Sequence, residues 1–191
     1  TELFSLKGKT AIVTGASGAL GGAAVRAMVL AGADVAACYN TNPGRLSALT
    51  DELAESGSRI ETYRVNSFSR EEIEAHAEAV CKDFGGIDVV INTAGGNVSG
   101  AYFADGQTIF DADLAAQFDT VTLNLFGGCI WPCLAYGKKM LGNPEGGSII
   151  NHSSISAYPA VRGHIAYAAA KASAGNFNSS PAVPTARYRN A

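Results

Sequence analysis

The chain has 191 residues, of which 47% are hydrophobic and 16% charged, so it can bury a core without disulfides or metal and is not intrinsically disordered. Its formal net charge is −3, with no block of Lys or Arg, which argues against nucleic acid and anionic membranes as partners. Neither a secretory pattern nor an apolar run of roughly 18 residues occurs. We therefore expect a cytoplasmic protein with one domain over residues 1–191.

Short β-branched runs alternate with helical segments along the chain. We predict strands at residues 10–14, 34–39, 60–65, 87–91 and 147–153. Helices are expected at residues 19–31, 43–57 and 111–140. A further helix should begin at the Ser69–Glu72 capping box and end at Gly85, and a last one should start at about residue 163. Because no hairpin signal joins two strands, the pattern predicts an α/β fold, doubly wound around a mostly parallel sheet. Such folds bind ligands beyond the carboxyl ends of the strands.

Glycine-rich segments follow two of these strands. After the first comes Thr14-Gly-Ala-Ser-Gly-Ala-Leu-Gly21, in which a sharp turn leads into a helix. The N–H groups and the dipole at such a helix start favour a pyrophosphate, although a plain strand-to-helix turn would look similar. After the fourth strand, Asn92-Thr-Ala-Gly-Gly96 offers small residues against which a flat ring could lie.

Tyr167 and Lys171 lie four residues apart in the last predicted helix, so they share one face of it. An ammonium beside a phenol favours the phenolate, which suits a tyrosine that exchanges protons near neutral pH. The spacing also occurs by chance, but here it follows the fifth strand and Ser153-Ser154. Cys129 and Cys133 are four apart and could in principle bind a metal; we expect free buried thiols and no metal.

The motifs Thr14-Gly15…Gly21, Asn92-Thr-Ala-Gly95, Asn124, Ser154 and Tyr167-xxx-Lys171 together closely resemble the classical short-chain dehydrogenases/reductases, a Rossmann-fold family, from Leu6 to about Phe177. The resemblance implies that Tyr167 is the acid/base, that Ser154 binds the substrate oxygen, that Lys171 acidifies Tyr167 and holds the nicotinamide ribose, and that Asn124 holds a water. It also implies a set of cofactor-binding residues: Gly15, Ser17, Leu20, Gly21, Tyr39, Asn66, Asn92, Ala94 and Gly95, with Tyr167 and Lys171.

The sequence departs from the family pattern in ways that concern the cofactor. Asn66 stands where an Asp is usual, and Thr93 where a second Asn is common. The second strand ends in Tyr39-Asn-Thr-Asn42 without the acid that NAD-preferring relatives use for the ribose 2′-hydroxyl, and Arg45 follows. We expect NAD or NADP as cofactor, with a slight preference for NADP.

The segments around Gly96 and Ser148–Tyr158 look most like the D-mannonate (fructuronate) oxidoreductases and gluconate dehydrogenases, which implies a sugar acid as substrate. We expect Asn97, His152 or Ser156 to meet substrate hydroxyls, and Arg162 or His164 to meet a carboxylate. A solvated loop charge is the alternative for Arg162.

The C-terminal part departs most from the family, which continues with further strands and a substrate lid. Pro181 and Pro184 fall where the last helix should continue, so we expect this part to be incomplete. A catalytically silent cofactor-binding or scaffold protein therefore remains an alternative, whereas a Ser154 hydrolase is disfavoured because no Gly-x-Ser-x-Gly surrounds it. The family commonly forms homotetramers, which implies a homo-oligomer (tetramer or dimer) acting on a small molecule.

Overall fold

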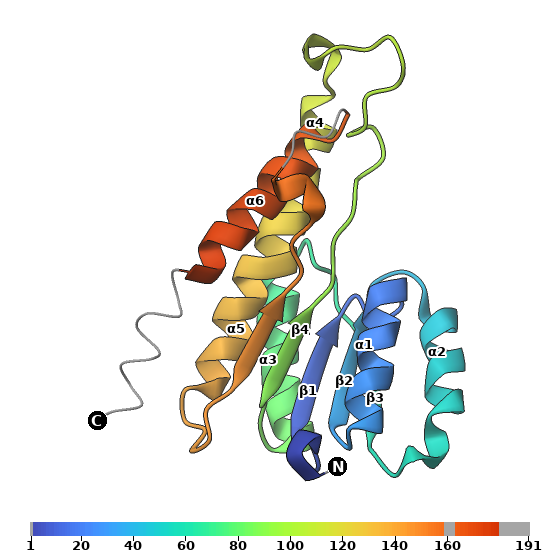
Figure 1. Ribbon diagram of the computed structural model, residues 1–191, viewed down its shortest axis with the longest axis vertical. Coiled ribbons are helices and arrows are strands. Elements are labelled where there is room, and N and C mark those ends of the chain that lie inside the picture. Colours follow the sequence, from blue (N-terminus) through green and yellow to red (C-terminus); the bar gives the residue numbers. More distant parts are fainter. Residues whose placement is uncertain (1, 159–162, 180–191) are drawn as a thin grey trace.

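The computed structural model describes residues 2–158 and 163–179. Its centre is a parallel sheet of five strands in the order β3-β2-β1-β4-β5 (Figure 1). The strands are β1 (Thr10–Thr14), β2 (Asp34–Tyr39), β3 (Ile60–Arg64), β4 (Val89–Asn92) and β5 (Ser148–Asn151). The chain runs outward from β1 to β3 and then returns past β1 to β4. This reversal confirms the doubly wound fold and places a switch point between β1 and β4.

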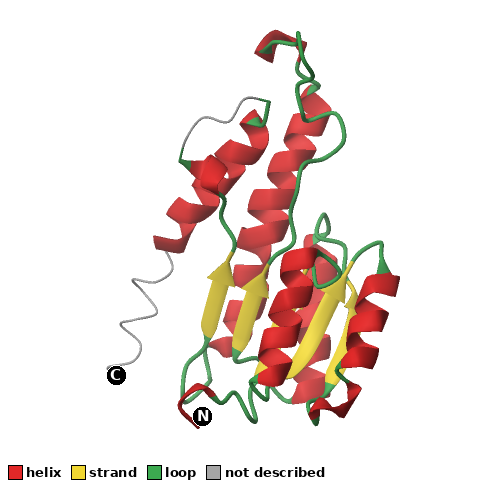
Figure 2. Ribbon diagram, turned by 45° about the vertical axis from the view of Figure 1, so that its right-hand side comes forward, coloured by secondary structure: helices red, strands yellow, loops and turns green. Residues whose placement is uncertain are grey.

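Helices flank the sheet on both faces (Figure 2). On one face, α1 (Ala19–Leu30) and α2 (Pro43–Glu52) bury Val25, Val29 and Leu46 against β1 and β2. On the other face, α3 (Arg70–Phe84) and α5 (Trp131–Met140) bury Ile73, Val80 and Met140. Alternate residues of each strand supply the two cores, because successive side chains of a strand point to opposite faces.

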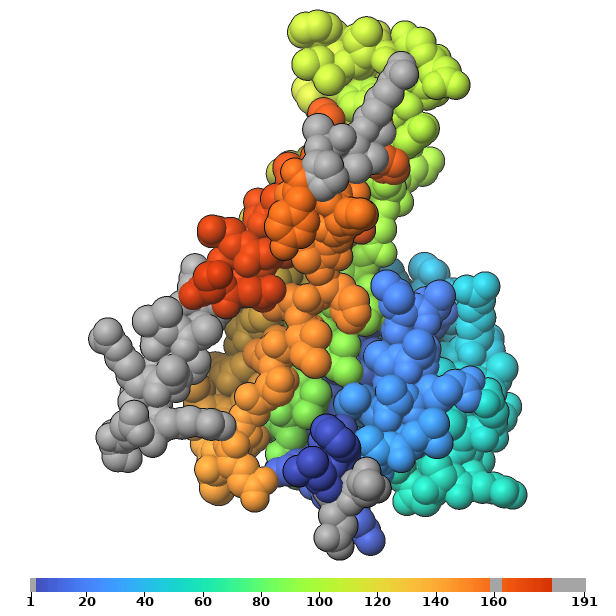
Figure 3. Space-filling model, in the orientation of Figure 1, coloured from blue at the N-terminus to red at the C-terminus, as the bar shows by residue number. Residues whose placement is uncertain are grey.

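The helix predicted at residues 111–140 consists of three successive parts. A short 3-10 turn at Ile109–Asp111 precedes α4 (Leu114–Val121), whose first turn is capped by the Asp113 carboxylate. A π-helical stretch, η4 (Thr122–Ile130), then leads directly into α5. The segment around α4 extends beyond the body formed by the sheet and its helices (Figure 3). The helix α6 (Ile165–Ser179) packs against α4 and η4.

Two helix ends differ from the prediction. Helix α2 ends at Glu52, and a separate 3-10 turn at Ala54–Ser56 completes the segment up to the left-handed Gly57. At the start of α3, Ser69 Oγ accepts from the Glu72 N–H as predicted (3.1 Å), but the Glu72 carboxylate accepts from the Asn66 N–H (2.9 Å) rather than from the cap. Glu72 therefore fixes the loop after β3. Pro181 and Pro184 lie outside the described residues.

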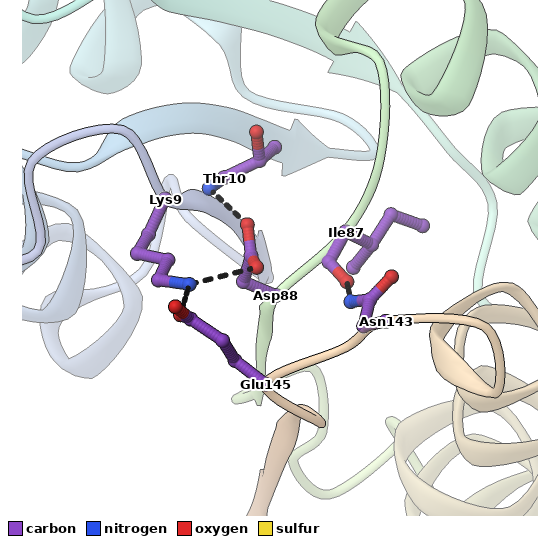
Figure 4. A network of polar contacts seen from close by, with 6 residues as sticks. All are labelled: Lys9, Thr10, Ile87, Asp88, Asn143 and Glu145. Atoms are coloured by element: carbon purple, nitrogen blue, oxygen red, sulfur yellow. Dashed lines mark hydrogen bonds and ion pairs between the residues drawn. The ribbon is translucent and has the colours of Figure 1, made fainter.

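A polar network joins the amino ends of the strands (Figure 4). Lys9 forms ion pairs with Asp88 (3.5 Å) and Glu145, and Asp88 accepts from the Thr10 N–H (2.9 Å). The Asn143 amide donates to the main chain just before β4 (2.7 Å). These contacts link β1, β4 and the turn before β5 at the edge opposite the carboxyl ends, which leaves the carboxyl ends free for a binding site.

Candidate active site

A cleft of ≈ 320 Å³ opens at the carboxyl ends of β1, β2 and β4. Clefts of this size are typical of small-molecule sites. Five residues predicted to bind the cofactor line it: Gly15, Ser17, Tyr39, Ala94 and Gly95. Residues that were not predicted to bind the cofactor also line it, among them Cys38, Asn40, Thr41, Ser67, Leu123 and Tyr136. Asn40, Thr41 and Ser67 follow a strand end, which is the signal that could have found them, whereas Cys38 belongs to β2, Leu123 to η4 and Tyr136 to α5.

The wall of the cleft depends on close contact between the loops after β1 and β4. Gly15 has a φ of 65°, and a Cβ there would lie 2.9 Å from the backbone N and Cα of Ala94. Thr14 Oγ1 accepts from the N–H groups of Thr93 and Ala94, each at 3.2 Å. Only glycine combines this left-handed conformation with so close an approach. The small residues of the loops after β1 and β4 therefore fit a flat group that lies against both loops.

The other predicted cofactor residues in these loops do not border the cleft. Leu20 is 66% exposed at the start of α1, and Gly21 packs against the carbonyl of Gly15. Asn66 Oδ1 accepts from the Phe68 N–H (3.1 Å) and orders the loop after β3. Asn92 donates to Asn151 Oδ1 (2.8 Å) and so links β4 to β5.

Asn124 lies fully buried in η4 beneath the loop after β4. Its Nδ2 donates to the carbonyl of Gly96 (2.7 Å) and to that of Thr120 (2.8 Å), and its Oδ1 accepts from the Gly96 N–H (2.9 Å). The amide thus satisfies both backbone groups of Gly96. A buried side chain bonded in this way fixes the shape of the loop.

Tyr167 and Lys171 share one face of α6, as their spacing predicts. Lys171 Nζ lies 5.7 Å from the centroid of the Tyr167 ring and donates to the carbonyl of His152 (2.9 Å). The lysine is only 5% exposed, and this burial lowers its pKa because desolvation disfavours the ammonium form. The Lys171 side chain thus lies beside the phenol ring of Tyr167. The half-buried Ser154, which follows β5, lies in the same region of the molecule.

The predicted substrate residues lie in the loops on the same side. Ser154 Oγ accepts from the Ser156 N–H (3.2 Å), and His152 Nδ1 lies 3.2 Å from the carbonyl oxygen of Asn92. Asn97 Nδ2 lies 2.5 Å from His164 Nδ1. Arg162 lies outside the described residues.

Cys129 and Cys133 remain free thiols and contact each other along the helix. In the described part of the chain, no three His, Cys, Asp or Glu side chains gather as metal ligands would. Within the same residues, no helix is both long and apolar enough to cross a bilayer.

Comparison with known proteins identifies the family. The model of the short chain dehydrogenase family matches residues 9–189. An uncharacterized oxidoreductase of Bacillus subtilis, UxuB, is 34% identical over 181 residues, which are 91% of this chain and 64% of the relative. D-threitol dehydrogenase of Mycolicibacterium smegmatis is 34% identical over 168 residues, or 88% of this chain and 61% of the relative. The chain thus spans about three fifths of the length of these relatives.

Solved structures give the same result for the fold. A candidate D-mannonate oxidoreductase from Haemophilus influenzae, solved with bound NAD, superposes with a TM-score of 0.86 at 29% identity over 97% of this chain and 69% of that chain. The NADPH-dependent 3-quinuclidinone reductase of Rhodotorula rubra gives a TM-score of 0.81 at 32% identity over 99% of this chain and 68% of that chain. The strand order, the motifs at the strand ends and these similarities agree: the chain belongs to the short chain dehydrogenase family.

Proposed function

We propose that the protein is an NAD(P)-dependent oxidoreductase that interconverts a secondary alcohol and a carbonyl compound. The observation that carries the proposal is the pair of Tyr167 and the buried Lys171. The Lys171 Nζ lies 5.7 Å from the centroid of the Tyr167 ring. When bound, the nicotinamide cofactor supplies or accepts the hydride. The protein must supply or accept the matching proton, and a phenol beside a cation is suited to do so.

Each catalytic side chain has a separate task in this proposal. In the direction of reduction, the Tyr167 hydroxyl donates its proton to the substrate oxygen, which becomes the alcohol; in oxidation it accepts that proton. The Ser154 hydroxyl donates a hydrogen bond to the same oxygen and stabilises its developing charge. Lys171 favours the phenolate electrostatically and would hold ribose hydroxyls of the cofactor. Asn124 keeps the loop around Gly96 in place.

The residues along the cleft would hold the cofactor, with Gly15 and Ser17 near the pyrophosphate and with Ala94 and Gly95 beside the rest. We propose NAD or NADP as the cofactor, with a slight preference for NADP. Ser17, Gly18 and Arg45 border a second hollow beside the glycine-rich loop, where a guanidinium can hold a phosphate. Arg45→Gln should therefore raise the KM for NADP about tenfold and leave that for NAD within twofold.

We further propose a sugar acid such as mannonate, fructuronate or gluconate as substrate. Similar proteins include one named for D-threitol and a candidate enzyme named for D-mannonate, which supports a polyhydroxy substrate. We propose a cytoplasmic location, which the four free thiols support because a reducing compartment keeps cysteines reduced. The protein should assemble as a homo-oligomer, a dimer or tetramer.

The decisive experiment is a screen for hydride transfer, with NAD(H) and NADP(H), against sugar acids and polyols. Tyr167→Phe should lower kcat at least a thousandfold, because the variant has no proton to exchange. Ser154→Ala should also lower kcat, since it removes a donor to the substrate oxygen. Cofactor binding without turnover in the whole wild-type protein would instead favour a catalytically silent scaffold.

A further inference from the structure

Three side chains from separate segments meet beside Tyr167. Asn97 Nδ2 lies 2.5 Å from His164 Nδ1, and the Tyr102 ring lies 4.9 Å from the His164 ring, centroid to centroid. The His164 ring also meets the Tyr167 ring edge-on, at 6.5 Å between centroids. His164 is therefore a neighbour of both an exposed tyrosine and the proposed proton donor. We name Asn97, Tyr102 and His164 the His164 cluster.

The backbone fixes this arrangement independently of the side chains. The Phe103 N–H donates to the carbonyl of Gly163 (3.3 Å), which joins the segment after β4 to the start of α6. Gly163 has a φ of 85°, and a Cβ there would lie 2.8 Å from the Tyr102 ring. Glycine is thus required both by the backbone conformation and by the close approach of the tyrosine. The ring of Tyr102 is held over His164 rather than placed there by chance.

The contact with Asn97 is consistent with one tautomer of His164. With Asn97 Nδ2 as the donor, Nδ1 accepts, and a neutral His164 then carries its ring proton on Nε2. Within the described residues, Nε2 has no hydrogen-bond partner, so its N–H is available to a ligand. Tyr102 is 56% exposed and adds an apolar wall next to this donor. Together they offer one oriented donor beside one flat apolar surface.

We propose that the His164 cluster recognises a substrate oxygen next to the reacting carbon, with the His164 Nε2–H as donor and the Tyr102 ring against the carbon chain. This inference rests on the proposed function, because it takes Tyr167 as the group that meets the reacting oxygen. A substrate held there extends its neighbouring hydroxyl toward His164. The substrate class is therefore a vicinal polyhydroxy compound, either a polyol or its acid, and not a simple secondary alcohol. His164 is a specificity-determining residue and performs no proton transfer.

The test compares two substitutions of His164 that separate its shape from its donor. His164→Phe keeps a ring beside Tyr102 and Tyr167 without the N–H, whereas His164→Gln keeps an N–H without the ring. The substrates are whichever of D-gluconate, D-mannonate and D-threitol the whole wild-type protein oxidises, and cyclohexanol, which has no neighbouring hydroxyl. We expect His164→Phe to lower the ratio of kcat/KM for the polyhydroxy substrate to that for cyclohexanol at least tenfold, and His164→Gln less than threefold. An unchanged ratio, or an equal fall in both variants, would overturn the inference.

Asn97→Leu is the second variant, since Asn97 is exposed and its replacement does not touch the core. Without the Asn97 amide, the ring proton of His164 can lie on either nitrogen. The ratio of kcat/KM for the polyhydroxy substrate to that for cyclohexanol should therefore fall at least threefold, and a ratio equal to that of the wild type would count against the role of Asn97.

A binding measurement separates this inference from the proposed function. The chain has three histidines, so the imidazole nitrogens can be followed by NMR in histidine-labelled protein. With NADP present, D-gluconate, D-mannonate or D-threitol should shift the Nε2 signal of His164 and leave that of the buried His76 unchanged. A shift without turnover would reject the proposed function and retain the cluster as a binding site. Turnover without a shift, or no shift with any of the three compounds, would reject the cluster.

Discussion

At the scale of single residues, a second buried polar cluster predicts how stability depends on pH. His76 of α3 is 5% exposed, and its Nδ1 lies 2.9 Å from the Tyr136 hydroxyl. The Cys38 thiol lies 3.6 Å from its Nε2, and the Tyr63 ring meets it edge-on at 4.7 Å. Burial lowers the pKa of His76 to about 4, because desolvation disfavours the charged imidazolium.

The direction of the effect follows from proton binding. An unfolded histidine binds a proton below pH ~6.5, whereas His76 in the folded protein does so only below about 4. Its contribution to the free energy of unfolding is therefore complete above pH ~6.5 and is lost as the pH falls toward 4, by about 1.4 kcal/mol per pH unit and roughly 3 kcal/mol in all. Urea unfolding at several pH values, for wild type and His76→Gln, measures the difference. Parallel curves between pH 4 and 6.5 would contradict the prediction.

Sequence analysis could place such residues on a face but could not assemble this cluster. Cys38, His76 and Tyr136 come from a strand and two helices, and periodicity within one element says nothing about contacts between elements. By contrast, the alignment of Tyr167 with Lys171 was predictable because both belong to one helix. The same limit applies to Tyr102 and His164, which meet across 61 intervening residues of chain.

At the scale of elements, η4 combines π-helical geometry with a close approach to a loop that is distant in sequence. Periodicity predicts one continuous helix over residues 111–140, and the chain is indeed helical from Leu114 to Met140. The middle part is π-helical, and Gly128 there lies so close to the loop after β4 that a Cβ would be 2.5 Å from the carbonyl oxygen of Ala94. Local sequence cannot reveal this, because the neighbour is more than thirty residues away. Wider π-helical turns are frequent at functional sites.

Gly128→Ala should therefore destabilise the protein, and its effect can be compared with a matched substitution in another helix. The new methyl group must push η4 away from Ala94 and displace Asn124, so we expect a loss of about 1–3 kcal/mol in the free energy of unfolding. Gly22 in α1 is the control, because a Cβ there would make ordinary contacts at 3.5 and 3.6 Å. Gly22→Ala should gain roughly 0.5–1 kcal/mol through lower backbone entropy in the unfolded chain. Urea unfolding of both variants gives the two values; equal stability would refute the steric argument.

At the scale of the whole molecule, α4 carries exposed apolar side chains that the described cores do not use. Leu114 and Phe118 lie four residues apart on α4, and Phe118 is 70% exposed. Exposed aliphatic and aromatic residues on one helix face commonly mark a surface that a partner covers. Such a surface would suit the homo-oligomer that the family resemblance implies.

Phe118→Asp should consequently reduce the molecular mass in solution, because association would bury a carboxylate without a partner. Sedimentation velocity of wild type and variant measures the change, while circular dichroism should be unaltered since Phe118 contributes little to the core of its own chain. Leu30→Asp is the control: Leu30 is 71% exposed at the end of α1, away from α4, so that variant should retain the wild-type mass. If Phe118→Asp keeps the wild-type mass, or if the wild type is already a monomer, the face around α4 is no subunit interface. A loss of mass confined to Phe118→Asp would locate the interface on the same long helix that carries Asn124, so that assembly and the shape of the active site would depend on one element.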